Sequence, residues 1–183
     1  MRIAVDIDST LHPYWDQLSA IAKRRFGVDL PYETQHSWDI TRLRPEQLRV
    51  CVAESHSESL VLAAQPYPGA VETIRGWHDA GHFIQVTSMR TEQATDATTR
   101  WLERIGLPYD ELWCSQDKVA RCVESRIDIL IDDAPPSLRE AAQAGITIAT
   151  IMHPWNRDLC EEEDIVAAPD WPTLARKLER VLA

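Results

Sequence analysis

The chain has 183 residues and carries 29 acidic against 19 basic side chains, a formal net charge of −10. This charge argues against a nucleic-acid backbone or an anionic membrane surface as the main partner. The length suits one domain, alone or with a sizeable insertion, and a hydrophobic fraction of 44% argues against disorder.

The N-terminal residues predict a buried strand. Residues 2–8 are apolar and β-branched and include two acids, Asp6 and Asp8. These acids interrupt the apolar run that a signal peptide would need, and a membrane span would need about 20 apolar residues. The four cysteines are scattered and form no C-x-x-C pair, a pattern typical of reduced thiols. We therefore expect a soluble, cytoplasmic protein with no membrane partner.

Residues 11–67, which we call the inserted segment, follow this strand. Apolar residues recur in it at helical spacing, and it is far too long for a loop. The turn sequence Pro66-Tyr67-Pro68-Gly69 ends it. We expect a small helical unit over the carboxyl edge of a sheet, with residues 1–10 and 68–183 forming the core domain.

After residue 68, predicted helices and strands alternate. We expect helices over 70–80, 91–105, 118–125, 137–144 and 173–182, and strands over 82–88, 111–114, 127–132, 146–152 and 165–168. Gly81, Gly106 and Gly145 follow three of these helices, as is usual at a helix C-terminus. The alternation predicts an α/β fold, a Rossmann-like parallel sheet with helices on both faces.

Polar side chains of the types that handle phosphate or Mg²⁺ follow the predicted strands. They are Asp6, Asp8 and Thr10, then Thr87, Ser88 and Arg90, then Lys118, and finally Asp132 and Asp133. In an open parallel sheet, ligands bind outside the carboxyl ends of the strands. Clustered carboxylates repel one another unless a cation neutralises them, and oxygen ligands without His or Cys favour Mg²⁺. The sequence therefore predicts a magnesium site at this edge.

Such a site suits phosphoryl transfer. A carboxylate can attack phosphorus and form an aspartyl-phosphate. A second carboxylate two residues further along a strand faces the same way, so it can protonate the leaving oxygen and later activate water. Hydroxyls and a lysine can bind the phosphoryl oxygens. We therefore expect a small phosphorylated metabolite as the partner, and no large nucleic acid.

The stretch Asp6-Ile7-Asp8-Ser9-Thr10 resembles the D-x-D-x-T motif of the haloacid dehalogenase (HAD) superfamily phosphatases. Thr87, Lys118 and the pair Asp132-Asp133 resemble the other three family motifs, in the family's order. The resemblance covers the core, about two thirds of the chain. An acid at position 8, which the dehalogenases of this superfamily lack, favours phosphoryl chemistry over carbon–halogen cleavage.

This resemblance implies a role for each matching residue. Asp6 would be the nucleophile and a Mg²⁺ ligand, and Asp8 the general acid/base with its backbone carbonyl on the metal. Asp132 and Asp133 would supply the remaining acidic ligands, at least one of them directly or through water. The phosphate-binding residues would be Thr87 and Lys118, helped by Ser88.

The inserted segment resembles the C1 cap with which the superfamily encloses its substrates. Ser37-Trp38-Asp39 and the Asp-Asp pair resemble the 5′(3′)-deoxyribonucleotidase-like branch, which implies a nucleoside monophosphate; a sugar phosphate is the alternative. Tyr14, Trp15 and Trp38 are candidates either for stacking on a base or for the core of the segment. His12 is a further substrate candidate, although we expect it at the surface.

Two other functions compete with this interpretation. A phosphate-accepting signalling receiver domain is also parallel α/β, but its acidic pair comes first and its acceptor Asp later, the reverse of the order here. A non-catalytic family member would be expected to lack a motif residue, and this sequence has them all.

Overall fold

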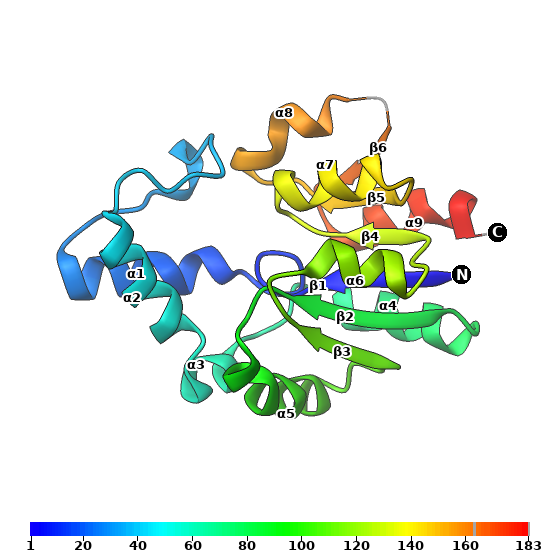
Figure 1. Cartoon of the computed structure of the whole chain (residues 1–183), viewed down its shortest axis with the longest axis horizontal. Coiled ribbons are helices and arrows are strands. Elements are labelled where there is room, and N and C mark those ends of the chain that lie inside the picture. The colour runs from blue at the N-terminus through cyan, green and yellow to red at the C-terminus, as the bar shows by residue number, and fades with distance from the viewer. Residues whose placement is uncertain (163, 183) are drawn as a thin grey trace.

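The computed structural model describes residues 1–162 and 164–182 and contains a six-stranded parallel sheet (Figure 1). Glu163 and Ala183, both within the predicted core range, lie outside the described residues. The strand order is β3-β2-β1-β4-β5-β6, and every pairing is parallel. The strands are Arg2–Asp6 (β1), Phe83–Ser88 (β2), Glu111–Cys114 (β3), Ile129–Ile131 (β4), Thr147–Ile151 (β5) and Ile165–Ala168 (β6). The predicted fold class is confirmed.

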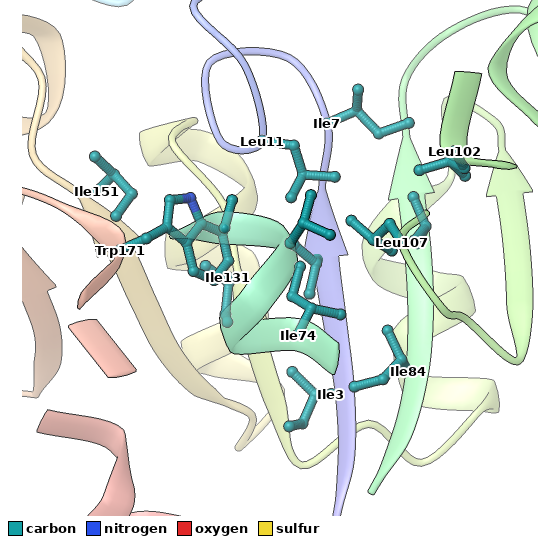
Figure 2. Packing of buried hydrophobic residues seen from close by; sticks show 14 of the residues in the cluster. Ile3, Ile7, Leu11, Ile74, Ile84, Leu102, Leu107, Ile131, Ile151 and Trp171 are labelled. Carbon is teal, nitrogen blue, oxygen red and sulfur yellow. The ribbon is translucent and has the colours of Figure 1, made fainter. Parts of the chain in front are cut away.

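Successive side chains of β1 point to opposite faces of the sheet, and both sets are buried because helices cover both faces. On one side, Ile3 and Val5 pack with α4 (Ala70–Asp79), α5 (Thr95–Ile105) and α9 (Trp171–Leu182). Figure 2 shows Ile74 of α4 and Trp171 of α9 over this face. On the other side, Ala4 packs with α6 (Lys118–Glu124), α7 (Pro135–Gln143) and α8 (Arg157–Cys160).

Several element boundaries differ from those predicted. The predicted helix over 91–105 is a 3₁₀ turn, η2 (Glu92–Ala94), followed by α5. Helix α7 begins at Pro135, two residues early, because proline suits the first turn of a helix, where its missing N–H costs nothing. Helix α9 begins at Trp171, also two residues early.

The inserted segment contains α1 (Tyr14–Phe26), a 3₁₀ turn η1 (Tyr32–Thr34), α2 (Pro45–Ser55) and α3 (Glu58–Ala63). Its helices lie beyond the arrowheads of β2 and β3 in Figure 1, at the carboxyl end of the sheet. The segment has its own hydrophobic cluster, which includes Trp15, Leu18 and Cys51. One core residue, Trp155 of η3 (Pro154–Asn156), joins that cluster. Within the described ranges, no helix is long and apolar enough to span a bilayer.

Candidate active site

Three buried carboxylates meet at the carboxyl edge of the sheet. Asp6 is the last residue of β1, and Asp132 and Asp133 directly follow β4, which pairs with β1. One carboxylate oxygen from each residue lies within 4.8 Å of the other two. All three residues are buried. A group of three hard oxygen donors in such a space suits Mg²⁺.

Lys118, the first residue of α6, is the cation within this cluster. Its Nζ donates to Asp6 Oδ1 at 2.5 Å and to Asp132 Oδ2 at 2.6 Å. Burial alone would lower the pKa of Lys118, but the two carboxylates raise it above its usual range, so the side chain stays charged.

One lysine does not balance three buried carboxylates. Burial raises the pKa of Asp6 to about 7; Lys118 opposes this shift, and the charges of Asp132 and Asp8 add to it. Burial and the charges of Asp6 and Asp132 raise the pKa of Asp133 as well. The cluster is therefore short of positive charge, which a divalent cation would supply.

The two acids of the pair differ in their partners. Asp132 accepts at both oxygens, from Lys118 Nζ and from the backbone N–H of Ala134 at 2.9 Å. Asp133 Oδ2 accepts from Trp155 Nε1 at 3.0 Å. Its Oδ1 accepts no hydrogen bond from the residues that the structure describes, so Asp133 has an oxygen available to a metal.

Asp8, two residues after Asp6, has different surroundings. Arg90 donates from Nη2 to Oδ1 at 2.6 Å and from Nε to Oδ2 at 3.1 Å. His12 Nε2 lies 3.0 Å from Oδ1, and His56 Nε2 lies 3.2 Å from Oδ2. Burial would raise the pKa of Asp8, but the charge of Arg90 and these hydrogen bonds hold it well below its usual range. The two aspartates of the motif are thus in opposite electrostatic situations.

The hydroxyls of β2 lie beside Asp6. Thr87 is in register with Asp6 on the neighbouring strand. Its Oγ1 is buried and has no hydrogen-bond partner among the described residues, and the same holds for Thr10 Oγ1. Ser88 lines the cavity described next, and its Oγ accepts from the backbone N–H of Arg90 at 3.2 Å. Buried hydroxyls rarely lack partners in proteins, so both threonines have unused hydrogen-bonding capacity. Neither threonine lines the cavity, whereas Ser88 does.

A cavity of about 390 Å³ opens onto the cluster. Its charged end is formed by Asp6, Asp8, Lys118, Asp132 and Asp133. Its other end is formed mainly by aromatic and aliphatic side chains of the inserted segment, namely Tyr14, Trp15, Leu18, Trp38, Ile40, Leu48 and Val52. This volume lies in the range typical of small-molecule sites.

The three aromatic candidates occupy different positions around the cavity. Trp15 is buried in the segment's cluster and donates from Nε1 to the backbone carbonyl of Leu30. Tyr14 is half-buried, and its hydroxyl bonds to Ser55 Oγ at 2.9 Å. Trp38 is 43% exposed and lies at the cavity wall. Trp38 thus has the most free surface to offer a ligand.

Two sequence-predicted candidates lie in unexpected places. His12 is not at the surface: it is 1% exposed and packs edge-on against Trp101 of α5, with ring centroids 5.6 Å apart. Arg90 is 2% exposed and is not among the residues that line the cavity. Both side chains face Asp8 instead.

Sequence reasoning missed several polar or sulfur-containing residues of the site. His56 bonds to Asp8 and Trp155 to Asp133, while Met89 and Gln116 line the cavity. The histidines show no metal-ligand spacing, so nothing in the pattern singled out His56. A possible signal for Met89 and Gln116 was their position one or two residues away from Ser88 and Lys118.

Comparisons with known proteins identify a family and a fold for this chain. A family model described as "5' nucleotidase, deoxy (Pyrimidine), cytosolic type C protein" matches residues 1–175. No curated protein matches the chain.

Three solved structures illustrate the shared fold. A HAD family hydrolase from Deinococcus radiodurans with bound phosphate and sodium is 15% identical, with a TM-score of 0.67 over 99% of this chain and 96% of that one. A family IA HAD hydrolase from Entamoeba histolytica is 11% identical, with a TM-score of 0.66 over 97% and 99%. A D,D-heptose 1,7-bisphosphate phosphatase from Burkholderia thailandensis is 12% identical, with a TM-score of 0.56 over 98% and 97%. At these identities the likeness is one of fold.

Proposed function

We propose that this protein hydrolyses a deoxynucleoside monophosphate in a Mg²⁺-dependent reaction. The chain belongs to the family of deoxy (pyrimidine) 5' nucleotidases of cytosolic type C and is a HAD-superfamily phosphatase. One observation carries this proposal. Three buried carboxylates, two of them bonded to Lys118 Nζ, line a cavity that is otherwise lined largely by apolar and aromatic side chains.

Asp6 is the proposed nucleophile. Its Oδ1 accepts from Lys118 and has a second lone pair for a metal, which leaves Oδ2 to attack phosphorus. Asp8 is ionised in the free protein, so it takes up a proton from solvent as the substrate binds. In the first step a bond forms between Asp6 Oδ2 and phosphorus, the ester P–O bond breaks, and Asp8 gives that proton to the leaving oxygen, which departs as an alcohol. In the second step Asp8 takes a proton from water, whose oxygen attacks phosphorus and releases phosphate and free Asp6.

The proposed metal ligands are Asp6, the backbone carbonyl of Asp8, and Asp133, with Asp132 in a supporting role. Both Asp132 oxygens already accept hydrogen bonds, so its main task is to hold Lys118, whereas Asp133 keeps one oxygen free of donors from the described residues. When bound, Mg²⁺ supplies the positive charge that lets a phosphate approach these carboxylates. Lys118 and Ser88, which line the cavity, would bind the phosphoryl oxygens, and Thr87 would join them only if its buried hydroxyl became accessible when the substrate binds.

The inserted segment is the proposed cap domain, residues 11–67, on a core of residues 1–10 and 68–183. It supplies the apolar wall of the cavity, including Trp38 and Ile40, and such a wall suits the flat face of a nucleobase. The segment also lines the cavity with the polar side chains of Gln35, Ser37, Asp39 and His56. A flat apolar surface with polar groups beside it suits a base, which has an apolar face and a polar edge, and this combination supports the nucleotide over a sugar phosphate.

The test is turnover with Mg²⁺ on a panel of 5′- and 3′-deoxynucleoside monophosphates and sugar phosphates. We expect a deoxynucleotide to be preferred and Asp6→Asn to lower kcat by at least about 10³-fold, because the nucleophile is lost while its volume is kept. Circular dichroism would establish that the variant is folded. Full activity of Asp6→Asn would overturn the mechanism, and preference for a sugar phosphate would overturn only the nucleotide assignment.

A further inference from the structure

The Asp8 carboxylate is held by side chains from separate parts of the chain. Arg90, two residues after β2, contacts both of its oxygens, at 2.6 Å and 3.1 Å. His12 and His56 lie 44 residues apart in sequence, and each bonds to one oxygen. A guanidinium that contacts both oxygens fixes the plane of a carboxylate as well as its position.

Arg90 is built into the core and is not free to reach a substrate. Its Nη1 donates to Thr98 Oγ1 on α5 at 3.1 Å, and its backbone N–H donates to Ser88 Oγ. The residue is 2% exposed and does not line the cavity. Its charge is therefore directed at Asp8 rather than at a phosphate.

His56 belongs to the inserted segment, at the C-terminal end of α2. Its side chain is 15% exposed and lines the cavity, and its ring lies against Tyr14, with centroids 5.7 Å apart. Its bond to Asp8 exists only while α2 lies over the carboxyl end of the sheet. The inserted segment therefore contributes to the surroundings of this carboxylate.

We propose that Arg90 and His56 are positioning residues for proton transfer: Arg90 orients Asp8 from the core, and His56 completes this orientation from the inserted segment. The inference rests on the proposed function, because it concerns the carboxylate assigned to protonate the leaving group. A misoriented acid slows the cleavage of esters whose leaving oxygen needs a proton, and has little effect on esters whose leaving group departs as a stable anion.

The experiment compares kcat/KM for a deoxynucleoside monophosphate, which has a poor alkoxide leaving group, with kcat/KM for p-nitrophenyl phosphate, which has a good one. Asp8→Asn serves as the reference for complete loss of the acid. We expect Arg90→Met to lower kcat/KM for the nucleotide about 100-fold and for p-nitrophenyl phosphate less than tenfold. We expect Arg90→Lys, which keeps the charge without the two-point contact, to lie between wild type and Arg90→Met, and His56→Gln to shift the ratio about tenfold in the same direction.

Arg100→Gln is the matched control. Arg100 of α5 pairs with Glu58 of α3, so it also links the core to the inserted segment, but it is exposed and makes no contact with Asp8. Its loss should leave the ratio of the two kcat/KM values unchanged. If Arg90→Met does not fold, Arg90→Lys and His56→Gln decide the matter alone.

The outcomes distinguish a failure of the positioning role from a failure of the proposed function. If Asp8→Asn changes the ratio and the Arg90 and His56 variants do not, or lower both values equally, the positioning role is wrong and the proposed function stands. If the wild-type protein hydrolyses neither ester, the proposed function is wrong, and the positioning role falls with it.

Discussion

His153 is a buried side chain that links the turn after β1 to the inserted segment. Its Nε2 donates to the backbone carbonyl of Ser9 at 2.8 Å, so Nε2 carries the hydrogen and Nδ1 accepts from Tyr32 Oη at 2.7 Å. Ser9 has a φ of +62°, a left-handed conformation that is unusual for a residue with a side chain. The His153 ring also stacks on Trp155 at 4.5 Å. In the neutral imidazole, both ring nitrogens therefore have a hydrogen-bond partner.

This arrangement predicts that His153 weakens the fold in acid. Burial lowers its pKa from 6.5 to about 4, although the bond to Ser9 opposes the shift. The unfolded chain therefore takes up this proton below pH 6.5, and the folded chain only below pH 4. The contribution of His153 to the free energy of unfolding is therefore fully present above pH 6.5 and decreases as the pH falls towards 4. The total loss is about 3 kcal/mol.

Urea unfolding at pH 7 and pH 5 measures the effect. About 2 kcal/mol of the stability that wild type loses between these values should come from His153. His153→Gln should be less stable at pH 7 but should lose that much less on acidification. His36→Gln, at an exposed position, is the control and should behave like wild type. Equal pH dependence in wild type and His153→Gln would contradict the prediction.

At the scale of elements, the chain just before α4 approaches the start of α9 closely at one glycine. Gly69 precedes α4 with a φ of +83°, and a Cβ there would lie 2.9 Å from Cγ of Pro172, in the first turn of α9. The proline ring is closed onto the backbone, so its Cγ cannot move away by a change of rotamer. We expect Gly69→Ala to lower the free energy of unfolding by about 2–4 kcal/mol, because the left-handed backbone and the overlap both cost energy.

Gly81→Ala is the control that measures the cost of the left-handed backbone conformation without a steric overlap. Gly81 has a φ of +87°, and a Cβ at this position would meet no atom within 4 Å, so about 1 kcal/mol should be lost. Urea denaturation of both variants gives the difference. Equal losses would mean that α9 moves freely away from α4.

The fold was predictable from sequence because its elements follow local rules. Apolar strands alternate with helices of ordinary length, and glycines end three of those helices. Parallel topology then brings the ends of β1 and β4 together, which is why Asp6 and Asp132 could be expected near each other although they are far apart in sequence. The split before α5 was missed because the residues of η2 have no strong breaker among them.

The surroundings of Asp8 could not be predicted in the same way. Arg90 and His56 reach it from loops or helix ends, 82 and 48 residues away in sequence. No periodicity fixes where such ends lie, since tertiary packing alone decides it. The same holds for Trp155, which bonds to Asp133 from a turn after β5.

At the scale of the whole molecule, the net charge of −10 is partly concentrated in the core. Asp6, Asp132 and Asp133 are buried within 4.8 Å of one another and have one lysine between them. Carboxylates in this position repel one another and lose hydration, so they weaken the folded state unless a cation joins them. Metal binding and folding should therefore be coupled.

We expect Mg²⁺ to raise the melting temperature of this protein, because the ion binds the folded state and not the unfolded chain. At 100 times its Kd, Mg²⁺ should add about 2.7 kcal/mol to the free energy of unfolding, which corresponds to about 5–10 °C for a chain of this size. Differential scanning calorimetry with and without a chelator measures the shift, with NaCl at equal ionic strength to separate binding from screening.

The variant Asp133→Asn tests which residue binds the ion. Without metal, its melting temperature should be at least that of wild type, because a buried charge has been removed. With Mg²⁺, it should lose most of the increase in melting temperature. Asp29→Asn, at an exposed residue paired with Lys23, should keep the full response. A wild-type protein that melts at the same temperature with Mg²⁺ and with matched NaCl would show that this cluster is not a magnesium site.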